Sequence, residues 1–265
     1  MLFKLVKHLK AGRNIVKNSI YVEKNIRISE IFGPTIQGEG ILIGEPCIFV
    51  RTAGCDFRCI WCDSMHAVDS NFRNSWILYS TNDIFAKIEE LSKGFPLTIV
   101  LSGGNPAIQN LEPLIKLGVS KGYKFTIETQ GSIYKKWFAL LDTIVLSPKP
   151  PSSKTLNNWD IFTKCCSTKV NKLIIKIPVL DEADYIFAFN LAKKYSDIPI
   201  YLQPINNTPP TIDSLKGENC ESNIDLQAIK ERFIWLVERC VEDKWYNVRI
   251  LPQLHVLIWG NKGGV

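Results

Sequence analysis

The sequence lacks any apolar run that approaches the ~18 consecutive residues needed for a helix to span a bilayer. We therefore predict no membrane-spanning segment and no membrane partner. The basic start, Met1–Lys10, is interrupted by a charge every two or three residues, so it also lacks the apolar stretch of a secretory signal peptide. The spacing of Leu2, Leu5 and Leu9 instead predicts an amphipathic helix that packs on the body of the protein.

Cysteine is too scarce for a disulfide scaffold, since the 265 residues include only 8 of them. Cys55, Cys59 and Cys62 fall within eight residues, whereas the others are scattered. This distribution is typical of a metal site or a catalytic site in a reducing compartment. We therefore predict a cytoplasmic protein.

Strong compositional bias is also missing. Charged residues make up 22% and aromatic residues 11% of the chain, which excludes a disordered, collagen-like or coiled-coil protein. The net charge of +6 is mild, so it permits an anionic substrate or a nucleic acid but requires neither. The length fits one α/β barrel of roughly 250 residues or up to two smaller domains. We place one domain over residues 28–265, after a basic N-terminal extension over residues 1–27.

Short β-branched apolar runs alternate with helical patterns along the chain. The predicted strands are Ile28–Phe32, Cys47–Thr52, Leu97–Leu101, Tyr123–Glu128, Thr143–Leu146, Lys172–Val179, Ile198–Gln203 and Val248–Leu251. The first predicted helix follows the capping candidates Thr81 and Asn82 and stops at Gly94. The second follows the stripe Ile108, Leu111 and Ile115 to Gly118, and two more cover Asp181–Tyr195 and Leu226–Cys240. Strand–helix–strand crossovers are right-handed and build a parallel sheet. About six such units predict an α/β fold with an incomplete, (β/α)6-type partial TIM barrel.

Polar or glycine-rich groups follow four predicted strands at the point where each strand ends. They are Ser102-Gly103-Gly104, Glu128-Thr129, Ser147-Pro148-Lys149 and Gln203-Pro204. Turns are polar in general, but the carboxyl ends of parallel barrel strands share one rim, and that rim hosts the active site. We therefore expect these groups to surround the site.

The three clustered cysteines have the spacing C-x3-C-x2-C and follow a predicted strand and a glycine. Three thiolates this close together hold one compact metal centre. A [4Fe–4S] cluster is normally bound by four cysteines, so three would leave one iron open to a substrate-like ligand. The alternative is a structural zinc site, which His66, four residues after Cys62, would complete.

The cysteine spacing, with Trp61 just before the last cysteine, resembles the signature of radical S-adenosylmethionine (SAM) enzymes. More specific motifs resemble the 7-carboxy-7-deazaguanine synthase family. These motifs are Glu30–Gly40, Phe49–Cys55, Ser102–Pro106, Glu128–Gly131, Ser147–Lys149 and the tail Leu251–Lys262. They follow one another from about Ile28 to the C-terminus, so the resemblance covers all of the chain except its basic start.

The resemblance implies a radical SAM enzyme, a carbon–nitrogen lyase with the partial barrel of that superfamily. Cys55, Cys59 and Cys62 would bind a [4Fe–4S] cluster, and one-electron cleavage of SAM at its fourth iron would give a 5′-deoxyadenosyl radical. The family converts 6-carboxy-5,6,7,8-tetrahydropterin to 7-carboxy-7-deazaguanine with loss of ammonia, uses Mg2+, and supplies queuosine and other deazapurine pathways of tRNA modification. We expect an electron donor such as flavodoxin or ferredoxin, a homodimer, and no direct contact with nucleic acid.

Given this resemblance, we predict a substrate site along two segments and three strand ends. Arg51 would bind the substrate carboxylate with two parallel hydrogen bonds, unless it forms a surface ion pair. The backbone and amide groups of Ile36, Gln37, Gly38 and Glu39 would face the edge of the pterin, with Glu128 at its 2-amino group and Ser102 beside them. Ser64 would bind Mg2+ together with substrate oxygens and waters. The structural alternative is that Asp63 or Ser64 caps a helix.

The residues predicted to bind SAM follow the same resemblance. They are Trp61 at the adenine, Gly104 at the methionyl amino end, Ser147, Pro148 and Lys149 at the ribose and carboxylate, and Gln203 near the nucleoside. Radical SAM enzymes commonly carry Gly-Gly-Glu-Pro, whereas this chain has Asn105 at the third position. His255 would reach the site as part of a C-terminal lid, or it is a packed structural histidine, so it is not counted among the catalytic residues. No residue is predicted as a general base, and the reaction needs none, because the radical abstracts hydrogen directly.

Two other functions are compatible with the cysteine loop. A glycyl-radical-enzyme activating protein shares the three cysteines, but it would not account for Thr35–Gly40 or the C-terminal motif. A zinc-stabilised module that binds RNA or protein through the basic N-terminus would contain zinc and ignore SAM.

Overall fold

A single nine-stranded sheet organises the protein. The computed structural model describes residues 25–210 and 224–265, and in this part the strand order is β3-β1-β2-β4-β5-β6-β7-β8-β9. The strands are β1 (Ile26–Ile36), β2 (Pro46–Thr52), β3 (Ile77–Tyr79), β4 (Thr98–Gly103), β5 (Lys124–Thr129), β6 (Thr143–Leu146), β7 (Lys172–Val179), β8 (Ile200–Pro204) and β9 (Val248–Ile250). The predicted N-terminal helix lies outside the described residues, as do residues 1–24 of the predicted extension.

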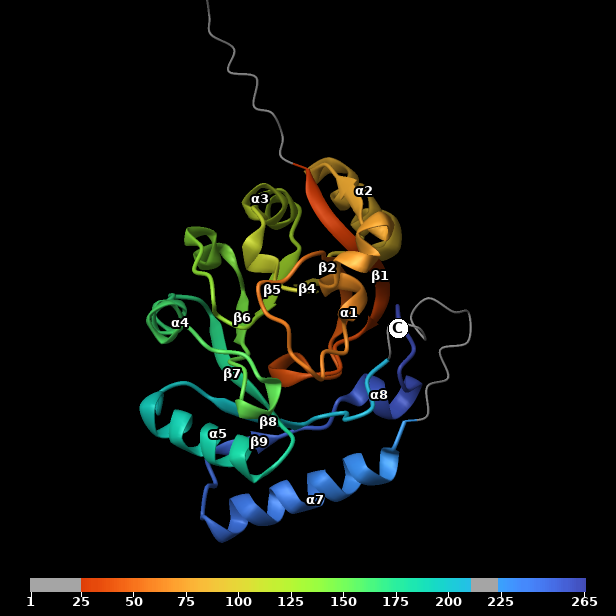
Figure 1. The fold of residues 1–265 in the computed structure, drawn as a ribbon. Coiled ribbons are helices and arrows are strands. Elements are labelled where there is room, and N and C mark those ends of the chain that lie inside the picture. Colours follow the sequence, from red (N-terminus) through yellow and green to blue (C-terminus); the bar gives the residue numbers. More distant parts are fainter. Residues whose placement is uncertain (1–24, 211–223) are drawn as a thin grey trace, which may run out of the picture.

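The sheet from β2 to β9 is parallel throughout, because each of its six neighbouring pairs is parallel. The helices between these strands are α2 (Thr81–Ser92), α3 (Glu112–Ser120), α4 (Trp159–Cys166), α5 (Glu182–Lys194) and α7 (Leu226–Glu242). They lie around the outside of the curved sheet (Figure 1). The predicted incomplete α/β barrel is therefore confirmed. One connection differs from the pattern, since β5 and β6 are joined through the 3-10 helix Lys136–Leu140.

The first predicted strand does not belong to the parallel set. β1 begins at Ile26, two residues before its predicted start, and pairs in antiparallel fashion with both β2 and β3. β3 was not predicted, since three residues are too few to show an alternating pattern. Strand direction depends on the partner and not on local pattern, so the sequence did not reveal this antiparallel edge.

Two helix boundaries also differ from the prediction. The side chain of Ser80, one residue before Thr81, accepts a hydrogen bond from the backbone of Asp83 in a capping box. α2 ends at Ser92, with Lys93 as its C-cap just before Gly94. Gly118 does not end α3, which continues to Ser120. A Cβ at Gly118 would lie 2.4 Å from the ring of Phe125, so this glycine allows α3 to pack closely on β5.

The core explains the long apolar runs of the central strands. Ile99, Val100 and Leu101 are consecutive in β4 and all fully buried, as expected for a parallel strand covered on both faces. A smaller cluster on the concave face contains Val145 and Ile174. No helix in the described residues is long and apolar enough to cross a membrane.

Candidate active site

The register of the parallel strands places the predicted strand-end residues on one face of the sheet. Arg51 pairs with Ser102, and Glu128 pairs with Val145 on the next strand. Side chains alternate between the two faces along a strand, and paired residues on neighbouring strands point to the same face. The strand pairing therefore identifies the side chains that share a face with Arg51. It consists of Arg51, Ser102, Glu128, Ser147, Lys176 and Gln203. These side chains face the concave side of the barrel near the carboxyl ends of the strands.

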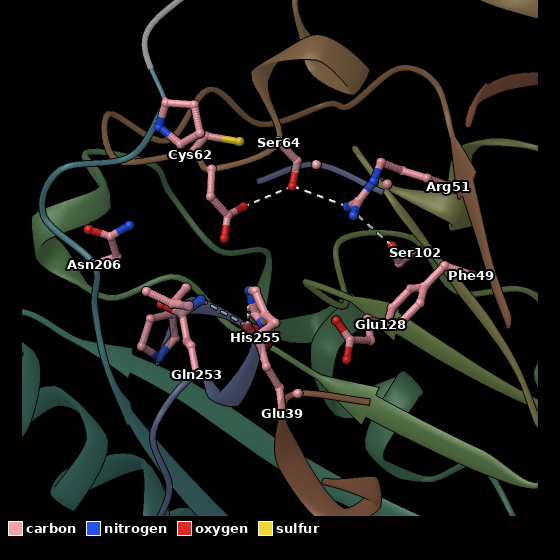
Figure 2. A pocket seen from close by; sticks show the side chains of 18 of the residues that line it. Glu39, Phe49, Arg51, Cys62, Ser64, Ser102, Glu128, Asn206, Gln253 and His255 are labelled. Atoms are coloured by element: carbon pink, nitrogen blue, oxygen red, sulfur yellow. Dashed lines mark hydrogen bonds and ion pairs between the residues drawn. The ribbon is translucent and has the colours of Figure 1, made fainter. Parts of the chain in front are cut away.

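A cavity of about 270 Å³ lies at this end of the barrel. Its wall contains every residue that the sequence predicted for the site except one: Cys55, Cys59, Cys62, Ser64, Trp61, Gly104, Ser147, Lys149, Gln203, Ile36, Gln37, Gly38, Glu39, Arg51, Ser102 and Glu128. Pro148 is the exception; it is buried behind the wall. Figure 2 shows the ten labelled side chains pointing toward the same space from strands, the cysteine loop and the C-terminal segment.

The cysteine loop connects β2 to the short helix α1 (Met65–Val68) and forms one side of the cavity. Its three thiols are partly buried. Burial raises the pKa of the Cys55 and Cys59 thiols and raises that of Cys62 to about 12. The loop is tied to the opposite rim, because the Ile60 N–H donates to the Ser153 carbonyl at 3.3 Å.

The side chains of the cysteine loop fit one of the two predicted metal centres better than the other. In the part of the chain that the structure describes, no three His, Cys, Asp or Glu side chains converge on one point as a single-ion site requires. His66, the fourth zinc ligand of the alternative prediction, contacts Glu30 Oε1 through Nε2 at 3.1 Å. A [4Fe–4S] cluster is bound differently, because its iron atoms occupy separate corners. Three separated thiols along one cavity wall fit that group.

Gly103 and Gly104 are required by the packing of the cysteine loop on the end of β4. A Cβ at Gly103 would lie 2.0 Å from Thr52 O, and one at Gly104 would lie 2.2 Å from Gly54 O and 2.9 Å from Cys55 Cβ. Gly103 also has φ +131°, which favours glycine. The two glycines therefore let the loop lie directly against the strand.

Asn105, the departure from Gly-Gly-Glu-Pro, is fully buried and not part of the cavity wall. Its Nδ2 donates to Asp56 Oδ1 at 2.8 Å, and its Oδ1 accepts from Thr129 Oγ1 at 2.8 Å. An acid here would face the Asp56 carboxylate. Asn105 thus connects the cysteine loop to the end of β5.

Arg51 is held at the cavity by an ion pair that lies in the wall and not on the outer surface. Its Nε donates to Glu30 Oε1 at 2.5 Å, while Nη1 reaches Ser64 Oγ at 3.3 Å and Ser102 Oγ at 3.4 Å (Figure 2). Burial raises the pKa of the Glu30 carboxyl, but the hydrogen bond of His66 and the charge of Arg51 outweigh it and lower the pKa to about 2. Glu30 is therefore an anion that fixes the guanidinium.

Ser64 precedes α1 but its side chain does not cap that helix. Its hydroxyl donates to Asp63 Oδ1 at 2.8 Å, beside the Arg51 guanidinium. Ser64 thus occupies the N-cap position of α1, as the structural alternative expected for Asp63 or Ser64, but without a capping hydrogen bond from its side chain. A hydroxyl oxygen beside a carboxylate is left at the cavity wall.

Lys176 was not predicted and lies at the centre of a buried charge cluster. Its ammonium group forms ion pairs with Glu39 and, at 3.4 Å, with Glu128 Oε2. Although burial disfavours every charge here, the pairing lowers the pKa of Glu39 well below its usual range and raises that of Lys176. The sequence signal that could have revealed Lys176 is its position within the apolar strand β7, because a buried lysine needs a partner of opposite charge.

The C-terminal segment closes the same side of the cavity. Gln253 Nε2 donates to Glu39 Oε1 at 2.8 Å, and His255 Nε2 lies 4.0 Å from the same oxygen (Figure 2). The Leu254 N–H donates to Gly38 O at 3.0 Å, and a Cβ at Gly38 would collide with the His255 ring. The lack of a side chain at Gly38 therefore allows the C-terminal segment to pack closely against it. The sequence had led us to expect that the substrate would make this close approach. Gln37 Nε2 in turn donates to Glu128 Oε1 at 3.0 Å.

Two groups of aromatic side chains line the cavity. Trp61 Nε1 donates to Ser152 Oγ at 2.9 Å, and Lys149 Nζ lies 5.8 Å from the Trp61 ring centre. Phe32 and Phe49 stack in parallel with centroids 4.9 Å apart, a pair that the sequence analysis missed. The only feature of the sequence that could have revealed this stack is that Phe32 and Phe49 lie in two consecutive predicted strands.

Gln203 carries an unsatisfied polar atom. Its side chain lines the cavity, and Oε1 is buried without a hydrogen-bond partner among the described residues. A buried carbonyl oxygen without a donor is costly, so this atom fits a bound ligand with an N–H or O–H group.

Similarity to known proteins agrees with this site. The chain is 37% identical over 249 residues to a 7-carboxy-7-deazaguanine synthase of Bacillus subtilis. The alignment covers 91% of this chain and 99% of that protein. The chain belongs to the 7-carboxy-7-deazaguanine synthase family. A family member of Bacillus cereus is 35% identical over 243 residues, with the same coverage. No family model matches the chain.

Solved structures agree with the family and with the fold. The crystal structure of QueE from Escherichia coli matches with a TM-score of 0.63 and 25% identity, over 87% of this chain and 95% of that one. Streptococcus suis SuiB shares the fold at a TM-score of 0.51 and 14% identity. The fold is thus the partial barrel of radical SAM enzymes, and a 7-carboxy-7-deazaguanine synthase is favoured over the activating protein and the zinc module.

Proposed function

We propose that the protein converts 6-carboxy-5,6,7,8-tetrahydropterin to 7-carboxy-7-deazaguanine with loss of ammonia, in queuosine and related deazapurine biosynthesis. The observation that carries this proposal is that the cysteine loop and the predicted substrate residues line one cavity. Membership of the 7-carboxy-7-deazaguanine synthase family supports the reaction. The family implies a [4Fe–4S] cluster and SAM, which together supply the radical that abstracts hydrogen.

The polar groups of the cavity suit a flat, acid-bearing heterocycle. Arg51 provides guanidinium N–H groups for the substrate carboxylate beside Ser102, and the fixed charge of Glu30 keeps its orientation. Glu128 and Glu39, held by Lys176, offer carboxylate oxygens to ring N–H and amino groups. Ile36, Gln37 and Gly38 form the adjoining wall. The Phe32–Phe49 stack supplies an apolar surface for a ring.

The opposite wall suits SAM. Cys55, Cys59 and Cys62 would hold the cluster, Trp61 would contact the adenine, and the backbone of Gly104 lies beside the cysteine loop. Ser147 and Lys149 are joined by a hydrogen bond of 3.0 Å and offer a hydroxyl and an ammonium group. The unpaired oxygen of Gln203 would accept from the ribose or the base. Pro148, behind the wall, would act only by shaping the segment between Ser147 and Lys149.

Mg2+ is proposed at Ser64. The Ser64 hydroxyl and the neighbouring Asp63 carboxylate are oxygen donors, as this ion prefers, and the remaining ligands would be substrate oxygens and waters. The position beside Arg51 would bring the ion and the guanidinium to the same anionic substrate group.

The remaining predictions concern the protein's surroundings. We propose flavodoxin or ferredoxin as the electron donor, because cleavage of SAM needs one external electron. The free cysteines support a reducing compartment, the cytoplasm. The homodimer and the division into residues 1–27 and 28–265 stay predictions, which sedimentation of the full chain and of a chain that begins at Ile26 would test.

The test of the proposed function is an anaerobic reaction of the reconstituted protein with SAM, Mg2+, a reductant and 6-carboxy-5,6,7,8-tetrahydropterin. We expect formation of 7-carboxy-7-deazaguanine and ammonia, detected by mass spectrometry. Cleavage of SAM with the pterin unchanged would contradict the substrate assignment. The Cys59→Ala variant is the matched control and should form no product.

A further inference from the structure

Gln130 contacts the cysteine loop directly and has no role in the proposed substrate or SAM contacts. It follows β5, is 5% exposed, and donates from Nε2 to Cys55 Sγ at 3.7 Å. The same nitrogen donates to Asp56 Oδ1 at 2.7 Å. Both hydrogens of the side-chain amide therefore point at the cysteine loop.

The orientation of this amide is fixed by its surroundings. Asp56 as a carboxylate only accepts hydrogen bonds, so it selects the NH2 end of Gln130 and not the oxygen. Asp56 Oδ1 also accepts from Asn105 Nδ2, and Asn105 is fully buried and held in turn by Thr129. The donor at Cys55 is thus preorganised by a chain of hydrogen bonds.

A hydrogen bond to the sulfur of a cysteine ligand changes how easily a cluster accepts an electron. An N–H group stabilises negative charge on the sulfur, and reduction adds one negative charge, so the bond is stronger in the reduced state. We propose that Gln130 is a positioning residue that raises the reduction potential of the cluster by donating a hydrogen bond to Cys55 Sγ. In that reduction one electron passes from an external one-electron donor to the cluster, the donor is oxidised, and no bond forms or breaks.

This inference rests on the proposed function, since it requires a [4Fe–4S] cluster at Cys55, Cys59 and Cys62. Its test compares the wild type with Gln130→Leu, which removes the donor and keeps a side chain of similar bulk. Gln109→Leu is the matched control: Gln109 donates to the carbonyls of Arg27 and Ala53 near the same loop, but to no cysteine sulfur.

The three reconstituted proteins are titrated anaerobically with redox mediators while the reduced cluster is followed by EPR. At a fixed potential, we expect the ratio of reduced to oxidised cluster in Gln130→Leu to fall by about tenfold, which is 59 mV for a one-electron couple. The Gln109→Leu variant should titrate like the wild type. Equal ratios in wild type and Gln130→Leu at equal iron content, or an equal shift in Gln109→Leu, would overturn the inference.

A second measurement needs no substitution at Gln130. The wild type is labelled with 15N in glutamine side-chain amides only, and the reduced cluster is studied by pulsed EPR. A nitrogen coupling that persists in Gln109→Leu supports the hydrogen bond, and its absence overturns the inference. A wild type that takes up no iron would overturn this inference and the proposed function together, whereas a loaded cluster without the coupling overturns the inference alone.

Discussion

Lys176 forms a buried ion pair with Glu39, although the two residues are 137 positions apart in the sequence. Both side chains are close to fully buried, and the ammonium group also neutralises Glu128 at 3.4 Å. The pairing with Lys176 lowers the pKa of Glu39 and keeps this carboxylate ionised at the proposed substrate edge. Without the lysine, burial would raise the pKa of Glu39.

We predict that Lys176→Met destabilises the protein by about 3–5 kcal/mol, because it leaves the largely buried Glu39, and the half-buried Glu128 beside it, without their cation. Chemical denaturation at pH 7 measures this change. The control is Lys116→Met, which breaks an exposed helical ion pair with Glu112 and should cost no more than about 0.5 kcal/mol. Equal effects of the two substitutions would show that the buried pair adds no stability.

We predict that Gly104→Ala displaces the cysteine loop. The new Cβ would collide with Gly54 O, which is backbone and cannot rotate away. Anaerobic reconstitution should give much less iron per chain than in the wild type. Gly44→Ala is the control, because Gly44 has φ +84° but open space around it. It should cost about 1 kcal/mol of backbone strain and leave the iron content unchanged, so iron loss in both variants would contradict the packing argument.

We predict an acid-sensitive contribution from Glu30. Its folded-state pKa of about 2 lies below the ordinary value of 4.5, so its contribution is fully present above pH 4.5 and is lost as the pH falls toward 2. The difference corresponds to about 3 kcal/mol. In urea denaturation, the wild type should have the higher free energy of unfolding at pH 7. Between pH 7 and pH 3 this free energy should fall less for Glu30→Gln than for the wild type. Parallel pH curves for the two proteins would be inconsistent with the ion pair.

We predict that Ser64→Ala weakens the binding of the Mg2+ that turnover requires. Loss of one oxygen ligand should raise the Mg2+ concentration needed for half-maximal rate by about tenfold, with the iron content unchanged. Ser75→Ala removes a hydroxyl that donates only to Phe72 O and is the matched control. An unchanged Mg2+ requirement in Ser64→Ala would place the ion elsewhere.

The parts of the site that the sequence revealed are those with a local signature. Glu128, Ser147 and Gln203 each follow an apolar run, so their position at the carboxyl end of a strand could be inferred without knowing which strands are neighbours. The three cysteines were found by spacing alone. The curved sheet then brings these groups to one cavity.

The missed residues depend on pairing between distant segments. Gln253 was not predicted and reaches Glu39 only because the tail packs on Gly38, a contact that its local sequence does not show. His255, which was considered only as part of a C-terminal lid, approaches Glu39 for the same reason. The antiparallel direction of β1 depends on its partners in the same way. Asn105 looked like a lost SAM contact, but its role is set by Asp56, which faces it across the loop.

The most direct test of the account is the metal content of the protein purified without oxygen. We expect iron and sulfide in the proportions of one [4Fe–4S] cluster per chain, and loss of both in Cys59→Ala. Zinc without iron or sulfide in the wild type would contradict it.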